Sequence, residues 1–331
     1  MSPKTVLILT NSKDGEHSDS VIRHLEFLRR KYFRLDVDRL ACGEIGVEVL
    51  SDSNGFSFSL FDGSRRMDSA DIASVWYRRP SYFDSPIKDE VQRKHAEKEI
   101  ESLLEGLWRT TSDVFWMNSP RSLDLVRKKM PQLQVASQLG FSVPKTLVTN
   151  DPARARQFID DCPRGAIYKT IDGGCFDYGD ETFVVPTTLV TEGLKQQLSL
   201  IRPMPALFQE RVEKEYELRV TVVGEAIFAV RINSQKYEET SLDWRDPDFV
   251  MRLEYAPVTL PREVANSIYK MMDRMGISFG AFDFAVDKSG THWFFEVNGS
   301  GQWYWLEHQT GLLISRSIAD ILTKAPRKEG L

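Results

Sequence analysis

The chain has 331 residues, 41% of them hydrophobic and 27% charged, and a formal net charge of −5. This length predicts two or three domains, and the slight acidity argues against a general nucleic-acid-binding protein, which usually carries a basic surplus. The early apolar run Val6–Leu9 is too short for a signal peptide, and no run approaches the roughly 18 residues of a membrane span, so we expect a cytoplasmic protein without a membrane or nucleic-acid partner.

The first third of the chain alternates short apolar runs with helical patterns. TVLILT at residues 5–10 predicts a strand, and apolar residues at helical spacing follow from Val21 to Leu28. A strand that leads into a helix is typical of a parallel α/β domain. Further strands are predicted at FRLDV, FSFSLF and SVWY, which begin at residues 33, 56 and 74, and a long helix is predicted over residues 88–111.

The middle of the chain also mixes strands and helices. VFWMNSP from Val114 ends in a Ser-Pro turn, and the helical stretch from Arg121 to Gln138 contains Pro131. Because proline breaks a helix interior but is tolerated in a first turn, we predict two short helices or one kinked helix. Two predicted strands, FSVPKTLVT and GAIYKT, flank a helix predicted over residues 153–159.

Two β-hairpins are predicted in the last third. ELRVTVVG and EAIFAVR alternate around Gly224, and AFDFAVD and HWFFEVN flank the turn DKSG. Between the hairpins lie a polar segment, residues 233–249, predicted as a long loop, and a helix with apolar residues from Val264 to Met275. The last residues, APRKEGL, are predicted to form a frayed tail.

The second hairpin carries a set of oxygen ligands. Asp283 and Glu296 lie on its two strands, and Asn298 is two positions beyond Glu296, so the three side chains are predicted to share one sheet face. Hard oxygen ligands suit Mg²⁺, which binds a few carboxylates together with substrate phosphates and water. A pair of solvated carboxylates is the alternative interpretation.

Cations and glycines upstream point to an anion. Lys169 ends the strand GAIYKT, where burying an ammonium group without an anion is costly. The next loop contains Gly173 and Gly174, whose backbone N–H groups could approach phosphate oxygens, and Lys129 begins the helix KMPQLQVA. A solvent-facing lysine at a helix end and an ordinary glycine loop are the alternatives.

The end of the strand ALFQERV is a candidate site for a nucleotide base. Backbone groups at Gln209 and Glu210 could pair with an adenine edge, and Glu217 could accept hydrogen bonds from ribose hydroxyls. A charged turn, EKEYE, with a solvated face is the alternative interpretation.

Several common motifs are missing. The sequence has no GxxxxGK[ST], HExxH or GxSxG, and residues 299–301 lack the third glycine of a dinucleotide fingerprint. The five histidines are scattered, and the three cysteines are widely spaced without a CxxC pair, which fits a reduced compartment and no structural zinc. Zinc and serine-nucleophile chemistry are therefore not expected.

In chain order, the candidate residues resemble the nucleotide and magnesium site of the ATP-grasp carboxylate–amine ligases, over roughly residues 118–320. The resemblance implies an α/β fold with an N-terminal parallel α/β pre-grasp domain (residues 1–116), a central lobe (117–205) and a C-terminal lobe (206–331), with ATP between the two lobes. The set comprises Lys129, Lys169, Gln209, Glu210, Arg211, Val212, Glu217, Asp283, Glu296 and Asn298.

The same resemblance implies a role for each of these residues. The two lysines would hold the ATP phosphates, Glu210 and Val212 would hold adenine through the main chain, and Glu217 would take the ribose. The Asp, Glu-x-Asn set would carry two Mg²⁺ ions.

A narrower resemblance rests on motifs at both ends of the chain. VWYRRP from Val75, the MNSP turn before a KxxQL helix, SVPKTLVTN from Ser142 and GQWYWLE from Gly301 resemble the maturases of graspetides, the microviridin-type peptide ligases. One position departs from that family. Gly299 follows the metal-binding asparagine where the family commonly has proline, which affects the rigidity of the loop more than the ligand atoms.

This likeness implies a reaction on a ribosomal precursor peptide with a leader and an acidic and hydroxyl-bearing core. An Asp or Glu side chain would attack the γ-phosphorus of ATP, and a Thr or Ser hydroxyl or a Lys amine would capture the acyl phosphate as an ester or an amide. Mg²⁺ and cationic side chains suit phosphoryl transfer because it depends on charge neutralisation and alignment. The family is often dimeric, so a homodimer is expected.

Two arginines on the first hairpin, Arg219 and Arg231, are predicted to face the same cleft. We assign them, as a hypothesis, to the γ-phosphate or the acyl phosphate. Cross-strand pairing with Glu217 or Glu225 is the alternative. The polar stretch SQKYEETSLDWRDPD is predicted to border the acceptor peptide, or to be a mobile flap.

Two rival functions stay open at this level. A ligase that adds glutamate or another amino acid to a protein tail or a small metabolite would have the same ATP site, but VWYRRP and GQWYWLE would then have no special reason to be present. A non-catalytic nucleotide-binding regulator is disfavoured because Asp283, Glu296 and Asn298 are all retained.

Overall fold

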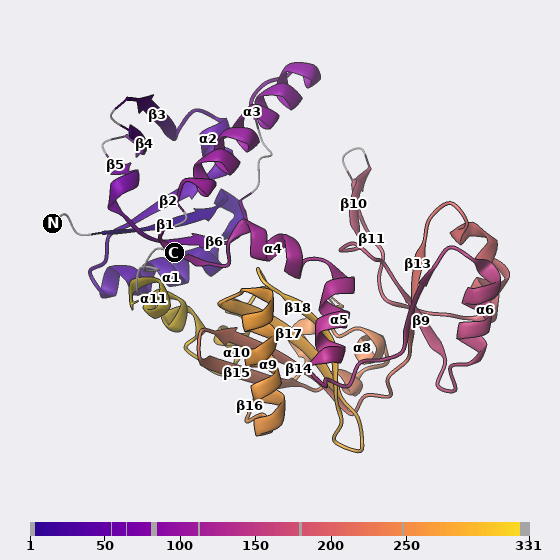
Figure 1. The fold of residues 1–331 in the computed structure, drawn as a ribbon. Helices are drawn as coiled ribbons and strands as arrows, with labels where there is room; N and C mark the ends of the chain where they lie inside the picture. Colours follow the sequence, from indigo (N-terminus) through magenta and orange to yellow (C-terminus); the bar gives the residue numbers. More distant parts are fainter. Residues whose placement is uncertain are drawn as a thin grey trace. The chain divides into compact units, whose positions relative to one another are not determined.

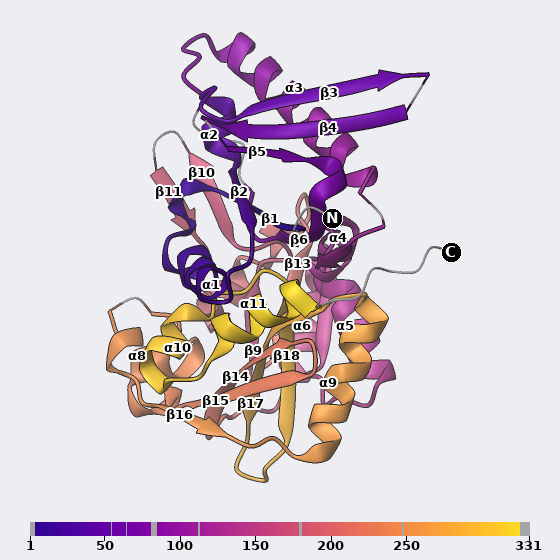
Figure 2. The ribbon, with the colours of Figure 1, turned by 90° about the vertical axis from the view of Figure 1, so that its left-hand side faces the viewer.

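The computed structural model describes residues 4–53, 55–63, 65–80, 85–111, 113–178, 181–246 and 248–324, and side chains at all of these except 175–182. Contacts group the chain into unit 1, Met1–Leu123 with Gly276–Phe279 and Ser300–Leu331, and unit 2, Asp124–Met275 with Gly280–Gly299 (Figures 1 and 2). The boundaries predicted at residues 116 and 205 stay predictions, and the tail APRKEGL lies outside the described residues. No helix in the described part of the chain is long and apolar enough to cross a membrane.

Unit 1 contains a parallel sheet of four strands in the order β2-β1-β6-β7, which confirms the predicted parallel α/β start. A separate antiparallel sheet has the order β3-β4-β5. The strands are β1 (Thr5–Thr10), β2 (Tyr32–Asp36), β3 (Gly46–Asp52), β4 (Gly55–Asp62), β5 (Arg65–Asp68), β6 (Ile72–Tyr77) and β7 (Phe115–Met117). The helices are α1 (Glu16–Phe27), α2 (Val37–Ala41), α3 (Glu90–Arg109), α4 (Pro120–Val126, which runs into unit 2), α10 (Tyr304–Thr310) and α11 (Ile314–Lys324).

Helices pack against both faces of the parallel sheet. Leu7 and Leu9 of β1 share a buried core with Leu104 and Leu107 of α3. Because successive strand residues point to opposite faces, the intervening residues meet the other layer. Buried apolar side chains on both faces explain why these short strands read as continuous hydrophobic runs in the sequence.

The second layer on this sheet comes from the far end of the sequence. Helix α11 packs against α1 and β6. The hydroxyl of Ser74 on β6 donates a hydrogen bond of 2.7 Å to the carbonyl of Leu322, and the hydroxyls of Ser20 and Ser315 are 2.9 Å apart. Residues after Ser300 therefore complete the core of the N-terminal domain, which the sequence boundaries did not anticipate.

Unit 2 contains two larger sheets and a two-stranded hairpin. One sheet has the order β12-β9-β13-β8, with α6 against it, and the other has the order β16-β15-β14-β17-β18. The first group comprises β8 (Thr146–Thr149), α6 (Pro152–Asp160), β9 (Ala166–Lys169), β12 (Thr188–Leu189), α7 (Glu192–Gln196), β13 (Ala206–Glu210) and the hairpin β10 (Cys175–Tyr178) and β11 (Glu181–Val184). The second comprises α5 (Lys129–Gln138), β14 (Tyr216–Val223), β15 (Ala226–Ile232), α8 (Glu238–Leu242), β16 (Tyr255–Val258), α9 (Arg262–Met275), β17 (Phe279–Val286) and β18 (His292–Asn298).

Both predicted hairpins, β14–β15 and β17–β18, are present and antiparallel. The predicted break near Pro131 is also confirmed, because α4 ends at Val126 and α5 begins at Lys129, with the proline in its first turn. The long loop predicted over residues 233–249 is wrong in part. It contains the short helix α8, in which the hydroxyl of Thr240 bonds the carbonyls of Ser234 and Tyr237.

Candidate active site

The hairpin β17–β18 brings the three predicted metal ligands to one face through a β-bulge. Counted from the turn, a regular ladder would pair Asp283 with Phe295 and turn Glu296 to the opposite face. Instead the register shifts by one residue after Phe294, so that Asp283 pairs with Glu296 and Ala281 with Asn298. The shared face is therefore confirmed by the strand register, whereas metal binding stays a prediction.

Arg219 on β14 contacts the first of these ligands. Its Nη1 lies 2.9 Å from both carboxylate oxygens of Asp283, and both side chains are buried. Burial raises the pKa of Asp283, and the positive charge of Arg219 opposes this shift. The alternative pairing of Arg219 with Glu217 or Glu225 is thus replaced by a salt bridge to a candidate metal ligand.

A second arginine, which the sequence interpretation did not single out, contacts the other carboxylate. Arg245 donates from Nε and Nη2 to the two oxygens of Asp243, at 2.8 and 2.9 Å. These hydrogen bonds raise the pKa of Arg245, and partial desolvation opposes the rise, although 55% of its side chain is exposed. Its Nη1 lies 3.5 Å from Oε1 of Glu296. The stretch DWR thereby places the guanidinium of Arg245 at the edge of the hairpin β17–β18, which carries the predicted metal ligands.

Lys169 at the end of β9 reaches the same hairpin. Its Nζ lies 4.8 Å from the ring centre of Phe295, the extra residue of the bulge. Burial lowers the pKa of Lys169, and the negative charges of Glu296 and Asp243 partly offset this effect. An ammonium that is desolvated yet surrounded by both signs of charge is suited to receive an additional anion.

Glu217 on β14 is buried and has a cationic partner. Lys214 donates from Nζ to Glu217 Oε1 at 2.8 Å and to the carbonyl of Leu242 at 2.9 Å. Burial raises the pKa of Glu217, and the charge of Lys214 opposes the rise. The carboxylate is placed on the same sheet as Asp283, while its predicted contact with ribose stays a prediction.

Gln132 of the KxxQL helix ties α5 to β18. Its amide accepts a hydrogen bond from the backbone N–H of Val297 at 2.8 Å and donates to the carbonyl of the same residue at 2.9 Å. Val297 stands between Glu296 and Asn298. The sequence interpretation assigned no role to Gln132, because a glutamine inside a helix carries no sign of what it will contact.

Lys129, three residues earlier, is the first residue of α5 and is half-buried. The hydrogen bonds of Gln132 to Val297 hold the start of α5 beside β18, the strand that carries Glu296 and Asn298. This placement is compatible with the predicted phosphate contact, which stays a prediction.

The end of β13 has its backbone partly committed to the sheet. The N–H of Glu210 donates to the carbonyl of Lys145 at 2.8 Å, and that of Arg211 donates to Gly165 at 2.9 Å. The carboxylate of Glu210 pairs with Arg164 at 3.0 Å. Val212 is buried beyond the strand end. Contact with adenine through the main chain would fall mainly to the carbonyl of Glu210 and to Val212.

The two loop glycines differ. Gly174 has a φ of +76°, and a Cβ there would lie 2.9 Å from Thr170 Oγ1 and 3.0 Å from the carbonyl of Val185. Gly173 is exposed, and a Cβ there would meet nothing within 4 Å among the described atoms. Gly174 therefore has a backbone reason to be glycine, and the predicted phosphate contacts of both glycines stay predictions.

The prediction that Arg231 and Arg219 face the same cleft is wrong. The register of β14–β15 pairs Arg219 with Val230 and Leu218 with Arg231. Because directly opposed residues share a face and neighbours alternate, the two arginines lie on opposite faces of the sheet. The guanidinium of Arg231 instead lies over the ring of Tyr216, 4.0 Å from its centre.

The donor set fits a magnesium ion. Asp283 and Glu296 offer carboxylate oxygens and Asn298 an amide oxygen, which are the hard ligands that Mg²⁺ accepts. A carboxylate has about four lone-pair positions, so Asp283 can pair with Arg219 and still bind a metal. Among the described residues, no three His, Cys, Asp or Glu side chains are grouped as a metal centre. Phosphate oxygens and water would have to complete the coordination.

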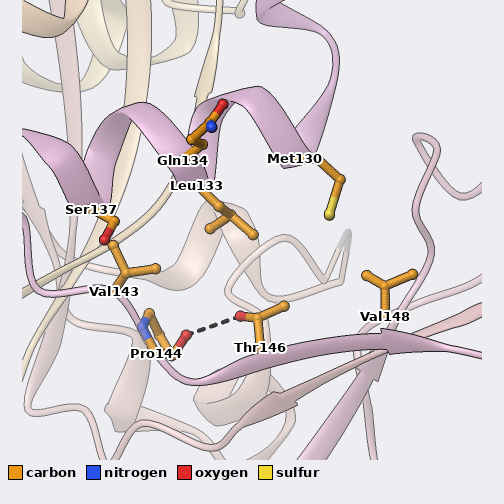
Figure 3. A pocket seen from close by; sticks show the side chains of 8 residues that line it. All are labelled: Met130, Leu133, Gln134, Ser137, Val143, Pro144, Thr146 and Val148. Atoms are coloured by element: carbon orange, nitrogen blue, oxygen red, sulfur yellow. Dashed lines mark hydrogen bonds between the residues drawn. The ribbon is translucent and has the colours of Figure 1, made fainter.

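A separate groove of about 440 Å³ lies between α5 and β8 (Figure 3). The hydroxyl of Thr146 donates to the carbonyl of Pro144 and accepts from Nε2 of Gln209, both at 2.9 Å. None of the predicted site residues is among its lining residues, which are Met130, Leu133, Gln134, Ser137, Val143, Pro144, Thr146 and Val148. The groove is therefore distinct from the hairpin site.

Comparisons with known proteins show which family the chain resembles. The family model of the MvdD pre-ATP grasp domain matches residues 5–124. Macrocyclase MdnC of Microcystis aeruginosa, solved bound with precursor peptide MdnA, is 31% identical, with 97% of this chain and 100% of that chain covered and a TM-score of 0.86. A RiPP-associated ATP-grasp ligase of Chryseobacterium gregarium, solved with ADP and a leader and core peptide, is 29% identical over 98% of both chains, with a TM-score of 0.89.

A further solved structure, macrocyclase MdnB of Microcystis aeruginosa, is 28% identical, with 97% of this chain and 100% of that chain covered and a TM-score of 0.79. The comparison with curated proteins gave no match.

The fold and these comparisons define an enzyme of the ATP-grasp class, a carboxylate ligase, and confirm the predicted α/β architecture. With this identity over nearly its whole length, the chain belongs to the family of ATP-grasp macrocyclases that act on ribosomally made peptides.

Proposed function

We propose that this enzyme uses ATP and Mg²⁺ to close rings in a ribosomal precursor peptide. The observation that carries the proposal is the bulged hairpin, which sets Asp283, Glu296 and Asn298 on one face with Lys169 against Phe295. These residues supply the oxygen ligands and the cation that an ATP triphosphate requires. The relatives solved with a precursor peptide, or with ADP and a leader and core peptide, support both kinds of ligand.

The reaction we propose has two steps. A carboxylate oxygen of a core Asp or Glu attacks the γ-phosphorus and the bond to ADP breaks. A Thr or Ser hydroxyl, or a Lys amine, of the same peptide then attacks the acyl carbon, loses its proton and releases phosphate. Two Mg²⁺ ions, when bound, would neutralise the phosphate charge in the first step.

The chain's own residues hold this chemistry in place. Lys169 and Lys129 bind phosphate oxygens, Glu210 and Val212 meet adenine through the main chain, and Glu217 takes the ribose. Arg219 pairs with Asp283, so we assign it the role of orienting that carboxylate, and its contact with the γ-phosphate or the acyl phosphate stays a prediction. Arg231 lies on the opposite face of the sheet, away from Asp283, and is given no role in the reaction. We also expect a cytoplasmic homodimer.

The test uses the full chain with a candidate precursor encoded by a neighbouring reading frame. Mass spectrometry should show the loss of one water for each bond formed, with one ADP released per bond. Glu296→Gln should lower product formation by at least about a hundredfold, because it removes a metal ligand. Lys288→Met, on the exposed turn of the same hairpin, is the control and should act like the native chain. ADP release that depends on a free amino acid would contradict the proposal.

A further inference from the structure

Arg78, in the motif VWYRRP, is almost fully buried in unit 1, with 1% of its surface exposed. Its Nη1 donates hydrogen bonds to the carbonyls of Ser300 and Gly301, the latter at 3.2 Å. Arg79 donates from Nε to the same carbonyl of Ser300 at 3.2 Å. Two neighbouring arginines thus hold the backbone that follows β18.

The guanidinium of Arg78 also packs on an aromatic cluster. It lies 4.7 Å from the ring centre of Trp303, which is itself buried and donates from Nε1 to the hydroxyl of Ser315 at 3.0 Å. The ring centres of Trp76 and Phe279 lie 5.8 and 5.4 Å from that of Trp303. The motifs VWYRRP and GQWYWLE, far apart in the sequence, therefore meet around this one cation.

Stability alone does not account for an arginine at this position. Its Nε lies 3.3 Å from the carboxylate of Asp14, yet neither Nε nor Nη2 donates a hydrogen bond to any residue that the structure describes. Burial lowers the pKa of Arg78 to about 9. A buried ion pair with unmet hydrogen bonds is often no more stabilising than apolar side chains of similar volume. An apolar residue at this position could not donate hydrogen bonds to the backbone carbonyls of Ser300 and Gly301.

We propose that Arg78 is a positioning residue for the magnesium site, because it fixes the backbone that leaves β18 directly after Asn298. Gly299 lies between the metal ligand and the anchored carbonyls, and glycine allows wide backbone freedom. An anchor on Ser300 and Gly301 replaces the rigidity that a ring-constrained residue would give at that position. This inference rests on the proposed function, in which Glu296 and Asn298 bind Mg²⁺.

The test measures metal binding directly. Mn²⁺ is titrated into the full-length chain in the presence of ADP and followed by electron paramagnetic resonance. Arg78→Met should raise the Mn²⁺ dissociation constant on the order of tenfold, as for other residues that orient metal ligands. Arg78→Lys, which can restore one hydrogen bond, should give an intermediate value. The matched control is Arg34→Met, which removes ion pairs to Asp19 and Asp36 elsewhere in unit 1.

Every outcome of the Mn²⁺ titration either supports or overturns the inference. A native dissociation constant in Arg78→Met, or an equal rise in Arg34→Met, overturns the inference. If Arg78→Met does not fold, Arg79→Met decides in its place, because it removes the second hydrogen bond on Ser300: a raised constant supports the anchor and a native one overturns it. Glu296→Gln is measured in parallel. If that variant binds Mn²⁺ as the native chain does, the metal site itself is misplaced, which is a failure of the proposed function.

Discussion

If Lys169 holds the ATP phosphates, as we propose, the affinity for ATP should depend on pH in a predictable direction. Burial lowers its pKa, so the ammonium that would hold phosphate loses its proton below the usual range of a lysine. ATP affinity should therefore be full below the lowered pKa and should fall about tenfold per pH unit above it. Isothermal titration calorimetry between roughly pH 7 and pH 10, below the ordinary pKa of a lysine, measures this dependence.

Lys169→Arg is the control for this pH effect, since a guanidinium stays charged throughout the range. Its overall affinity for ATP should be lower, because the geometry differs, but the alkaline loss should disappear. If the native chain and Lys169→Arg lose ATP affinity equally at alkaline pH, a group other than Lys169 is responsible for the pH dependence.

Gln132 makes a prediction about stability. Gln132→Leu leaves the N–H and the carbonyl of Val297 without the side chain that pairs them. Each buried, unsatisfied backbone group costs about 1–3 kcal/mol, so the loss of both should lower the free energy of unfolding by roughly 2–6 kcal/mol. Urea unfolding measures it, with Gln134→Leu on the exposed side of the same helix as the control. Similar losses in both variants would show that the amide contact is unimportant.

At the scale of elements, alanine variants of the two glycines in the loop after β9 can distinguish backbone strain from contact with ATP. Gly174→Ala places a Cβ against Thr170 and Val185 at a positive φ, which should destabilise the segment around β10 by about 1–2 kcal/mol. Gly173→Ala should leave thermal unfolding unchanged but raise the ATP dissociation constant if its N–H approaches phosphate. Thermal unfolding and ATP titration on both variants decide, and a stability loss in Gly173→Ala alone would contradict this account.

Strand and hairpin positions were predictable from the sequence because alternation and turn residues are local signals. The bulge at Phe295 was not, because it depends on how the two strands pair, and without it Glu296 would face away from Asp283. The opposite faces of Arg219 and Arg231 follow from the same kind of register information. The contacts of Arg245 and Gln132 depend on tertiary packing, so no spacing rule could reveal them. Ile314, Ile318 and Leu322, by contrast, recur at helical spacing and would have predicted α11.

At the scale of the whole molecule, α11 should be indispensable to unit 1. Removal of residues 312–331 takes away the buried side chains of Ile314, Ile318 and Leu322 and exposes their neighbours on α1 and β6. At about 1.5–3 kcal/mol per large apolar side chain, the loss is comparable with the stability of a typical domain. Near-ultraviolet circular dichroism should show lost tertiary packing, while removal of residues 325–331 alone should leave the spectrum native. A native spectrum in the longer truncation would refute this role.

The dependence of unit 1 on α11 also sets an order of events during synthesis. The ribosome delivers β1, β2, β6 and β7 early, but the helix that covers one face of their sheet emerges only after residue 313. All of unit 2 has been translated by then. The N-terminal sheet must therefore wait with apolar surface uncovered, in a state that chaperones can bind, and a chain cut short by premature termination leaves that surface open to quality-control proteases.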